Sequence, residues 1–207
     1  RDKIEVAEMA ANGMLLSNHS YGIMSDRVPD WYFGSYIQVS RDWDKIMYNA
    51  PYYLMVTAAG NSKKSKDNEA PIFGSASNGF DLMLGFATSK NGVTVAAADI
   101  ETNDQGQLLS ASVTSYSSFG PVDDGRIKPD LLAQGSSTYV INSSGTITSA
   151  DGPSFSAPLV AGLATGVWQA FPNINVNNLI EAFVNSSTNS DIPDTDLGYG
   201  IPPYTAV

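Results

Sequence analysis

The sequence predicts an α/β protein with a doubly wound, mostly parallel β-sheet between two layers of helices. Apolar runs such as 93–98 show no polar alternation and end at turn residues, which is typical of strands buried on both faces. These runs alternate with segments of helical periodicity, as in three-layer α/β/α folds. Ligands bind such sheets at the carboxyl ends of the strands, so we expect a site in the segments that follow them.

Two helices and two strands are expected in the first sixty residues. Apolar spacing of three or four predicts a helix over 4–12, which ends at an Asn-Gly stop signal. A short buried strand is expected at 14–16 and a second at 52–57. Ser40 is expected to cap a helix that runs through residue 48. Six aromatic residues between 31 and 48 either cover the sheet, which buried rings usually do, or form a wall of a binding cleft.

The second half of the chain repeats the alternation. Strands are expected at 93–98 and 137–141, and the second of these leads through a turn into residues 146–148. A long helix of small residues is expected from residue 154 to about residue 171. A last helix is expected at about 176–184, with Asn175 as its cap.

Composition limits the class of protein. The chain has 207 residues, 43% of them apolar, which suits one domain with a substantial core. Its net charge of −10 argues against nucleic acid and anionic membranes as partners. The absence of cysteine excludes disulfides and thiolate metal sites, and no apolar run approaches the roughly 18 residues of a membrane helix. The composition is compatible with an exported bacterial protein, located outside the cell, in the periplasm or at the cell surface.

The segment Gly152–Pro158 is the strongest candidate for a reactive site. Ser154 follows a glycine directly before the first turn of the small-residue helix, where backbone N–H groups and the helix dipole stabilise negative charge. This placement suits a serine nucleophile, although a serine can also begin a helix without any reaction. The nucleophile elbow of α/β-hydrolases is excluded, because Ser156 replaces its last glycine and no histidine follows. A phosphate-binding loop is unsupported, because no Gly-x-x-x-x-Gly-Lys occurs.

Four ordered motifs resemble those of subtilisin-like serine proteases. Gly152–Pro158 resembles the family's Gly-Thr-Ser-Met-Ala-x-Pro, and Ser17–Gly22 resembles the strand whose Ser-x-Gly end binds substrate backbone. Ala58–Asn61 matches Ala-Ala-Gly-Asn, and 117–130 is similar to Ser-Ser-x-Gly-Pro followed by Asp-Gly-Arg-x-Lys-Pro-Asp. Residues 198–202 also resemble the closing segment of many bacterial members.

This resemblance implies a role for each matched position. Ser154 would be the nucleophile and Asn61 would donate its side-chain N–H to the oxyanion. Substrate binding would involve two further sets: Ser20, Tyr21 and Gly22 pair with an extended peptide, and Ala58, Ala59 and Gly60 line the primary specificity pocket. Proteins or peptides would be the substrates. No cofactor is expected. Calcium is frequent in the family as a structural ion, but the sequence does not place a site for it. The acidic clusters at 123–124 and 191–196 suit solvated turns.

Two departures from the family pattern qualify these roles. Pro153 replaces the usual threonine, which removes a hydroxyl and a backbone N–H near the oxyanion. The family's catalytic aspartate and histidine would lie upstream of Arg1, and the single histidine, His19, is expected to be structural or to line the cleft. We therefore expect residues 1–207 to be a partial subtilisin-like peptidase domain that lacks its N-terminal part and is inactive alone. The alternative is a non-catalytic, subtilisin-like binding domain.

Overall fold

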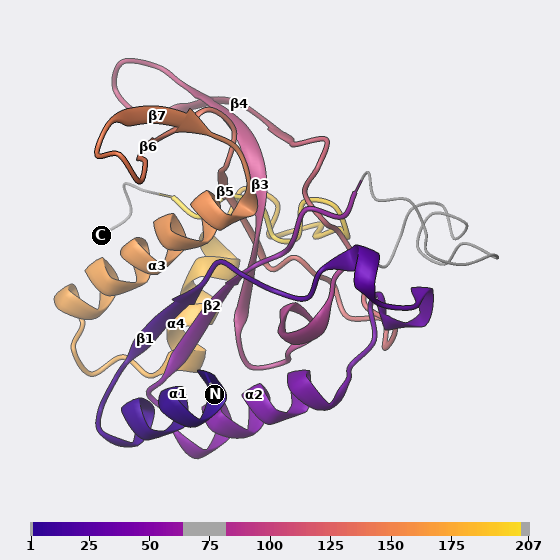
Figure 1. Ribbon diagram of the computed structural model, residues 1–207. Coiled ribbons are helices and arrows are strands. Elements are labelled where there is room, and N and C mark those ends of the chain that lie inside the picture. The colour runs from indigo at the N-terminus through magenta and orange to yellow at the C-terminus, as the bar shows by residue number, and fades with distance from the viewer. Residues whose placement is uncertain (1, 64–81, 204–207) are drawn as a thin grey trace.

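The computed structural model describes residues 2–63 and 82–203 and shows a central sheet with helices on both sides (Figure 1). The central sheet has the strand order β1-β2-β3-β4, and β5 also pairs with β3. Its strands are β1 (Leu16–His19), β2 (Leu54–Ala58), β3 (Val93–Thr102), β4 (Leu108–Val113) and β5 (Leu131–Gln134). A separate two-stranded sheet consists of β6 (Thr138–Ile141) and β7 (Ile147–Ala150).

Strands β1, β2, β3 and β5 are mutually parallel where they pair, and β4 runs antiparallel to the second half of β3. The register places Leu16 opposite Leu54 and Val56 opposite Val93. In the pairing of β3 with β5, Val95 lies opposite Leu131. The mostly parallel sheet expected from the sequence is therefore confirmed.

Successive residues of β2 point to opposite faces of the sheet, and each face has its own helices. Leu54 and Val56 pack in one core with α3 (Pro153–Ala170) and α4 (Val176–Ser186). Tyr53 and Met55 pack in another core with α1 (Asp2–Ala11) and α2 (Gln38–Asn49). The described connections contain three short 3-10 helices: η1 (Ser25–Arg27), η2 (Asp30–Tyr32) and η3 (Gly85–Thr88). The three-layer arrangement follows from this alternation.

Helix α3 lies against β1, β2, β3 and β5, which small residues on its inner face allow. Ala157 and Ala164 are fully buried in that interface. Gly152 precedes the helix at φ 143°, a value that favours glycine, and Pro153 occupies the first helical position, where a missing N–H costs little. No helix within residues 2–63 and 82–203 is long and apolar enough to cross a membrane.

Some details of the expected elements are wrong. Ser40 is not a cap: α2 begins at Gln38, and the buried Ser40 hydroxyl donates to the Gly85 carbonyl at 2.8 Å instead. The segment expected as a strand at 137–141 does not join the central sheet but forms the β6–β7 hairpin with 147–150. The Asn175 cap is confirmed, because its side chain accepts a hydrogen bond from the Asn178 backbone N–H.

The six aromatic residues between 31 and 48 differ in burial, and two of them, Tyr32 and Tyr36, are half-buried. Phe33 and Trp43 are 4% and 3% exposed and belong to the cores, whereas Trp31 and Tyr48 are 55% and 81% exposed. Only part of this group therefore covers the sheet, and none of it lines the pocket at the carboxyl ends of β1 and β2.

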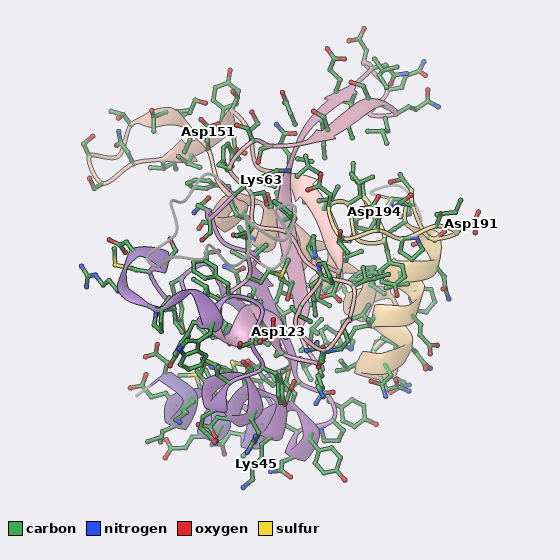
Figure 2. The ribbon with its side chains drawn as sticks, turned by 90° about the vertical axis from the view of Figure 1, so that its right-hand side faces the viewer. Lys45, Lys63, Asp123, Asp151, Asp191 and Asp194 are labelled. Atoms are coloured by element: carbon green, nitrogen blue, oxygen red, sulfur yellow. The ribbon has the colours of Figure 1, made fainter. Side chains whose placement is uncertain are left out.

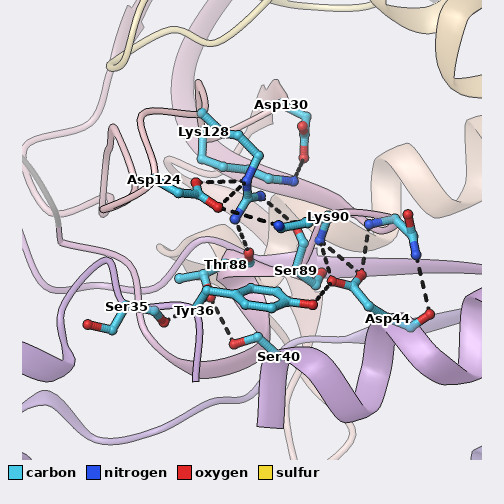
Figure 3. A network of polar contacts seen from close by, with 12 residues as sticks. Ser35, Tyr36, Ser40, Asp44, Thr88, Ser89, Lys90, Asp124, Lys128 and Asp130 are labelled. Carbon is cyan, nitrogen blue, oxygen red and sulfur yellow. Dashed lines mark hydrogen bonds and ion pairs between the residues drawn. The ribbon is translucent and has the colours of Figure 1, made fainter. Parts of the chain in front are cut away.

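A polar network joins α2 to the connection that carries η3 (Figure 3). The buried Asp44 carboxylate accepts hydrogen bonds from the backbone N–H groups of Lys90 and Asn91 and from the Tyr36 hydroxyl. The Arg126 guanidinium donates to the carbonyls of Thr88 and Ser89 at the end of η3. These contacts matter for the site, because η3 contributes one wall of its pocket.

The acidic clusters at 123–124 and 191–196 lie in surface turns. Asp123, Asp191 and Asp194 are exposed, and Asp191 lies at the right-hand edge of the molecule in Figure 2. Asp194 caps its own turn by accepting hydrogen bonds from the backbone N–H groups of Asp196 and Leu197. Within the described ranges no group of three or more acidic or histidine side chains could hold a metal ion.

Candidate active site

A pocket of about 350 Å³ lies where β1, β2, η3 and the start of α3 meet. The structure brings all eight candidate residues to this pocket: Ser20, Tyr21, Gly22, Ala58, Ala59, Gly60, Asn61 and Ser154. The segments that follow β1 and β2 meet there because parallel strands place their carboxyl ends at the same edge of the sheet. The sequence did not indicate the other nine lining residues, six of them apolar: Ile23, Met24, Leu82, Leu84, Phe86 and Ala87, together with Ser25, Asp26 and Ser62.

Ser154 lies in the first turn of α3, in hydrogen-bond contact with the end of β1. Its Oγ donates to the Ser20 carbonyl at 3.1 Å, and the Ser20 hydroxyl donates to the Ser154 carbonyl at 2.8 Å. Pro158 explains the second bond, because it has no N–H to donate to the carbonyl four residues before it. The serine is thus half-buried and held at a helix N-terminus, where negative charge is stabilised.

Asn61 follows a tight turn that the 117–118 segment fixes in place. Gly60 has φ 105°, and its carbonyl accepts a hydrogen bond from the Ser118 N–H at 2.8 Å. The Ser118 hydroxyl accepts a hydrogen bond from the Ser62 N–H at 2.9 Å. The Asn61 side chain is exposed and reaches toward α3: its Oδ1 is 3.6 Å from the position that a Cβ on Gly152 would occupy. The asparagine therefore lies beside the loop that presents Ser154.

His19 lies on the opposite face of the sheet from Ser154. Its ring packs edge-on against Trp43 of α2, with 4.7 Å between the ring centroids, whereas the neighbouring Ser20 contacts α3. Burial lowers the pKa of His19, and the Asp2 carboxylate offsets part of that shift. The only histidine of the chain is therefore not placed to remove a proton from Ser154.

The family model described as the subtilase family matches residues 1–200. The chain belongs to the subtilase family. Solved structures agree on the fold of this subtilase. Sphericase has a TM-score of 0.67 at 21% identity, and the match covers 98% of this chain and 62% of the Sphericase chain. A psychrophilic protease has a TM-score of 0.66 at 19% identity, covering 99% and 62%.

Fervidolysin from Fervidobacterium pennivorans, which is described as a keratinolytic enzyme related to subtilisin, has a TM-score of 0.62 at 20% identity. It matches 97% of this chain, and the match covers 27% of its own. The subtilase chain thus spans less than two thirds of the length of these relatives.

Proposed function

We propose that this subtilase chain is part of a serine endopeptidase in which Ser154 is the nucleophile. The single observation that carries the proposal is the meeting of Ser154 and Asn61 at an apolar pocket. Peptide backbone would pair along Ser20–Gly22 as an added strand, and a side chain would enter the pocket between Ala58–Gly60 and η3. In this arrangement a scissile carbonyl would lie beside the Ser154 hydroxyl.

In the proposed reaction, Ser154 Oγ attacks the carbonyl carbon and its proton passes to a base. The oxyanion accepts hydrogen bonds from the Asn61 side-chain N–H and from backbone N–H groups at the start of α3. The leaving amine takes the proton, and water then hydrolyses the acyl-enzyme. His19 lies on the other face of the sheet, so the base and its orienting aspartate would come from a segment outside these 207 residues. We propose an exported location on the basis of composition alone.

Fluorophosphonate labelling of the protein at its natural length tests the proposal. We expect covalent labelling at Ser154, and no labelling of a Ser154→Ala variant. Asn61→Ala should lower the turnover number by about 10²–10³-fold, the magnitude found for the oxyanion asparagine of subtilisin itself. An unlabelled Ser154 under conditions that label a known subtilase would refute the proposal.

A second candidate is a non-catalytic domain that binds extended peptides. Pro153 favours it, because proline removes a hydroxyl and an N–H at the residue before Ser154. Peptide binding that persists in Ser154→Ala, combined with no labelling of the wild type, would select this candidate.

A further inference from the structure

His19 is unused by the proposed reaction, yet it is 4% exposed and hydrogen-bonded at both ring nitrogens. Its Nε2 is 2.6 Å from the Ser17 hydroxyl, which is in turn 2.5 Å from the Tyr53 hydroxyl. Its Nδ1 is 2.8 Å from the Tyr21 hydroxyl. A neutral imidazole has one donor and one acceptor, and hydroxyl partners on both sides satisfy either tautomer. The ring is therefore held in one orientation.

The same ring also packs against the aromatic wall of the pocket. Its centroid is 5.4 Å from that of Tyr21 and 6.2 Å from that of Phe86, both in edge-to-face geometry. Tyr21 and Phe86 contact each other at 5.6 Å and both line the pocket. His19 thus supports these two pocket residues from behind, on the side away from the cavity.

The segment Ser20–Gly22 needs such support. The paired register of β1 and β2 ends with His19 opposite Thr57, so the segment lies beyond the last pair of the sheet. Ser20 is attached to α3 through its hydrogen bonds with Ser154. Tyr21 is 49% exposed, and its hydroxyl contacts both the His19 ring and the Asp2 carboxylate. The next residue, Gly22, has open space around it and no side chain that could anchor the segment.

We propose that His19 is a positioning residue for peptide binding, which acts by holding Tyr21 and Phe86 in place. The inference rests on the proposed function, because it assumes that peptide pairs along Ser20–Gly22. His19 itself touches neither the peptide nor the reacting atoms. The lowered pKa supports this role, since a neutral ring matches hydroxyl partners on both sides.

Two rates measured on the protein at its natural length separate positioning from mere folding. The first is hydrolysis of a peptide substrate with several residues on the acyl side, and the second is labelling of Ser154 by a small alkyl fluorophosphonate. We expect His19→Leu, which keeps an apolar side chain but no hydrogen bond, to raise KM about three- to tenfold, as for one lost hydrogen bond. The labelling rate should stay within about twofold, because the reagent is too small to need Tyr21.

Two further variants test the route through Tyr21. Tyr21→Phe removes the hydroxyl and with it the contacts to His19 and Asp2, so it should raise KM at least as much as His19→Leu, and the double variant should add little to Tyr21→Phe. His19→Asn retains a hydrogen-bonding group near Nδ1 and should recover part of the loss. Equal losses in hydrolysis and labelling, additive effects in the double variant, or unchanged KM would each overturn the proposal.

A binding measurement distinguishes failure of this inference from failure of the proposed function. If wild-type protein neither hydrolyses peptide nor reacts with fluorophosphonate, the proposed reaction is wrong. His19→Leu should still weaken the binding of the same peptide to a Ser154→Ala background, measured by fluorescence polarisation. If that background binds no peptide, the positioning role is wrong as well.

Discussion

Gly135 marks the closest approach between the central sheet and the loop that presents Ser154. Its N–H donates to the Ala98 carbonyl at 2.9 Å, and its carbonyl accepts from the Gly152 N–H at 2.7 Å. A Cβ at this position would lie 2.4 Å from the Ser156 hydroxyl oxygen, 2.5 Å from the Ala97 Cβ and 3.0 Å from the Gly152 carbonyl oxygen. We therefore expect Gly135→Ala to push the loop away from the sheet.

The size of the effect follows from these distances. Carbon atoms pack at about 3.5–4.0 Å, so a methyl group at 2.5 Å requires a shift of about 1 Å in buried backbone. Overpacking of this kind costs about 1–3 kcal/mol. Alanine also restricts the unfolded chain, and this entropic effect stabilises the folded variant by about 0.4–1 kcal/mol. Gly135 does not have a positive φ, so steric overlap alone is expected to destabilise the variant, by about 1–2 kcal/mol.

Gly162→Ala is the matched control. Gly162 lies inside α3 with nothing within 4 Å of the position that a methyl group would occupy, so alanine should stabilise the helix by about 0.5–1 kcal/mol. Thermal unfolding should separate the two variants by about 3–12 °C, at about 2–4 °C per kcal/mol for a chain of this size. Fluorophosphonate labelling should slow in Gly135→Ala alone. Equal melting temperatures for Gly135→Ala and wild type would refute the steric argument.

Two further predictions concern buried polar groups. Asp44→Ala should destabilise the protein by about 2–4 kcal/mol, because it leaves the Lys90 and Asn91 N–H groups without their acceptor. Tyr36→Phe, which removes one donor to Asp44, should destabilise it by about 1 kcal/mol. Urea unfolding measures both, and similar losses of stability would contradict the central place of Asp44. His19 has a pKa below 6.5 when folded and about 6.5 when unfolded, so the unfolded chain binds more protons and stability should fall as the pH drops below about 6.5. Asp2, Tyr21 and Tyr53 are the titratable groups near this ring. A pKa of the His19 ring at or above 6.5, measured by NMR titration, would refute the direction of the shift.

Burial and length explain why the sequence predicts some strands of the central sheet and misses others. Strand β3 can be expected because its first six residues are all buried. Strand β4 has no buried residue, so it shows no apolar pattern from which a strand could be predicted. Strand β5 is only four residues long and offers a run too short to recognise. Ser40 does not act as the expected cap because its hydroxyl serves a contact with Gly85, forty-five residues away, rather than its own helix.

Some residues of the candidate site could likewise be predicted from the sequence and others could not. Ser154, Asn61 and the 20–22 and 58–60 segments belong to motifs with local order, so the sequence could indicate them, although their roles remain proposals. The wall made by Leu82, Leu84 and Phe86 depends on how η3 packs beside β2, which no local pattern encodes. The orientation of His19 likewise follows from its place in β1 and from the rings of α2 and η3.

Strand β3 has a consequence for the rate at which the protein folds. It pairs with β2, β4 and β5, and its partners in β2 and β5 are far away along the chain, as the pairs Val56–Val93 and Val95–Leu131 show. Among the described strands of the central sheet, only the β3–β4 hairpin can form by closing a short loop, so the other pairings must wait until distant segments diffuse together. Folding should therefore be slow for a chain of this length. Until it is complete, the apolar strands remain accessible to proteolysis and to association with other chains.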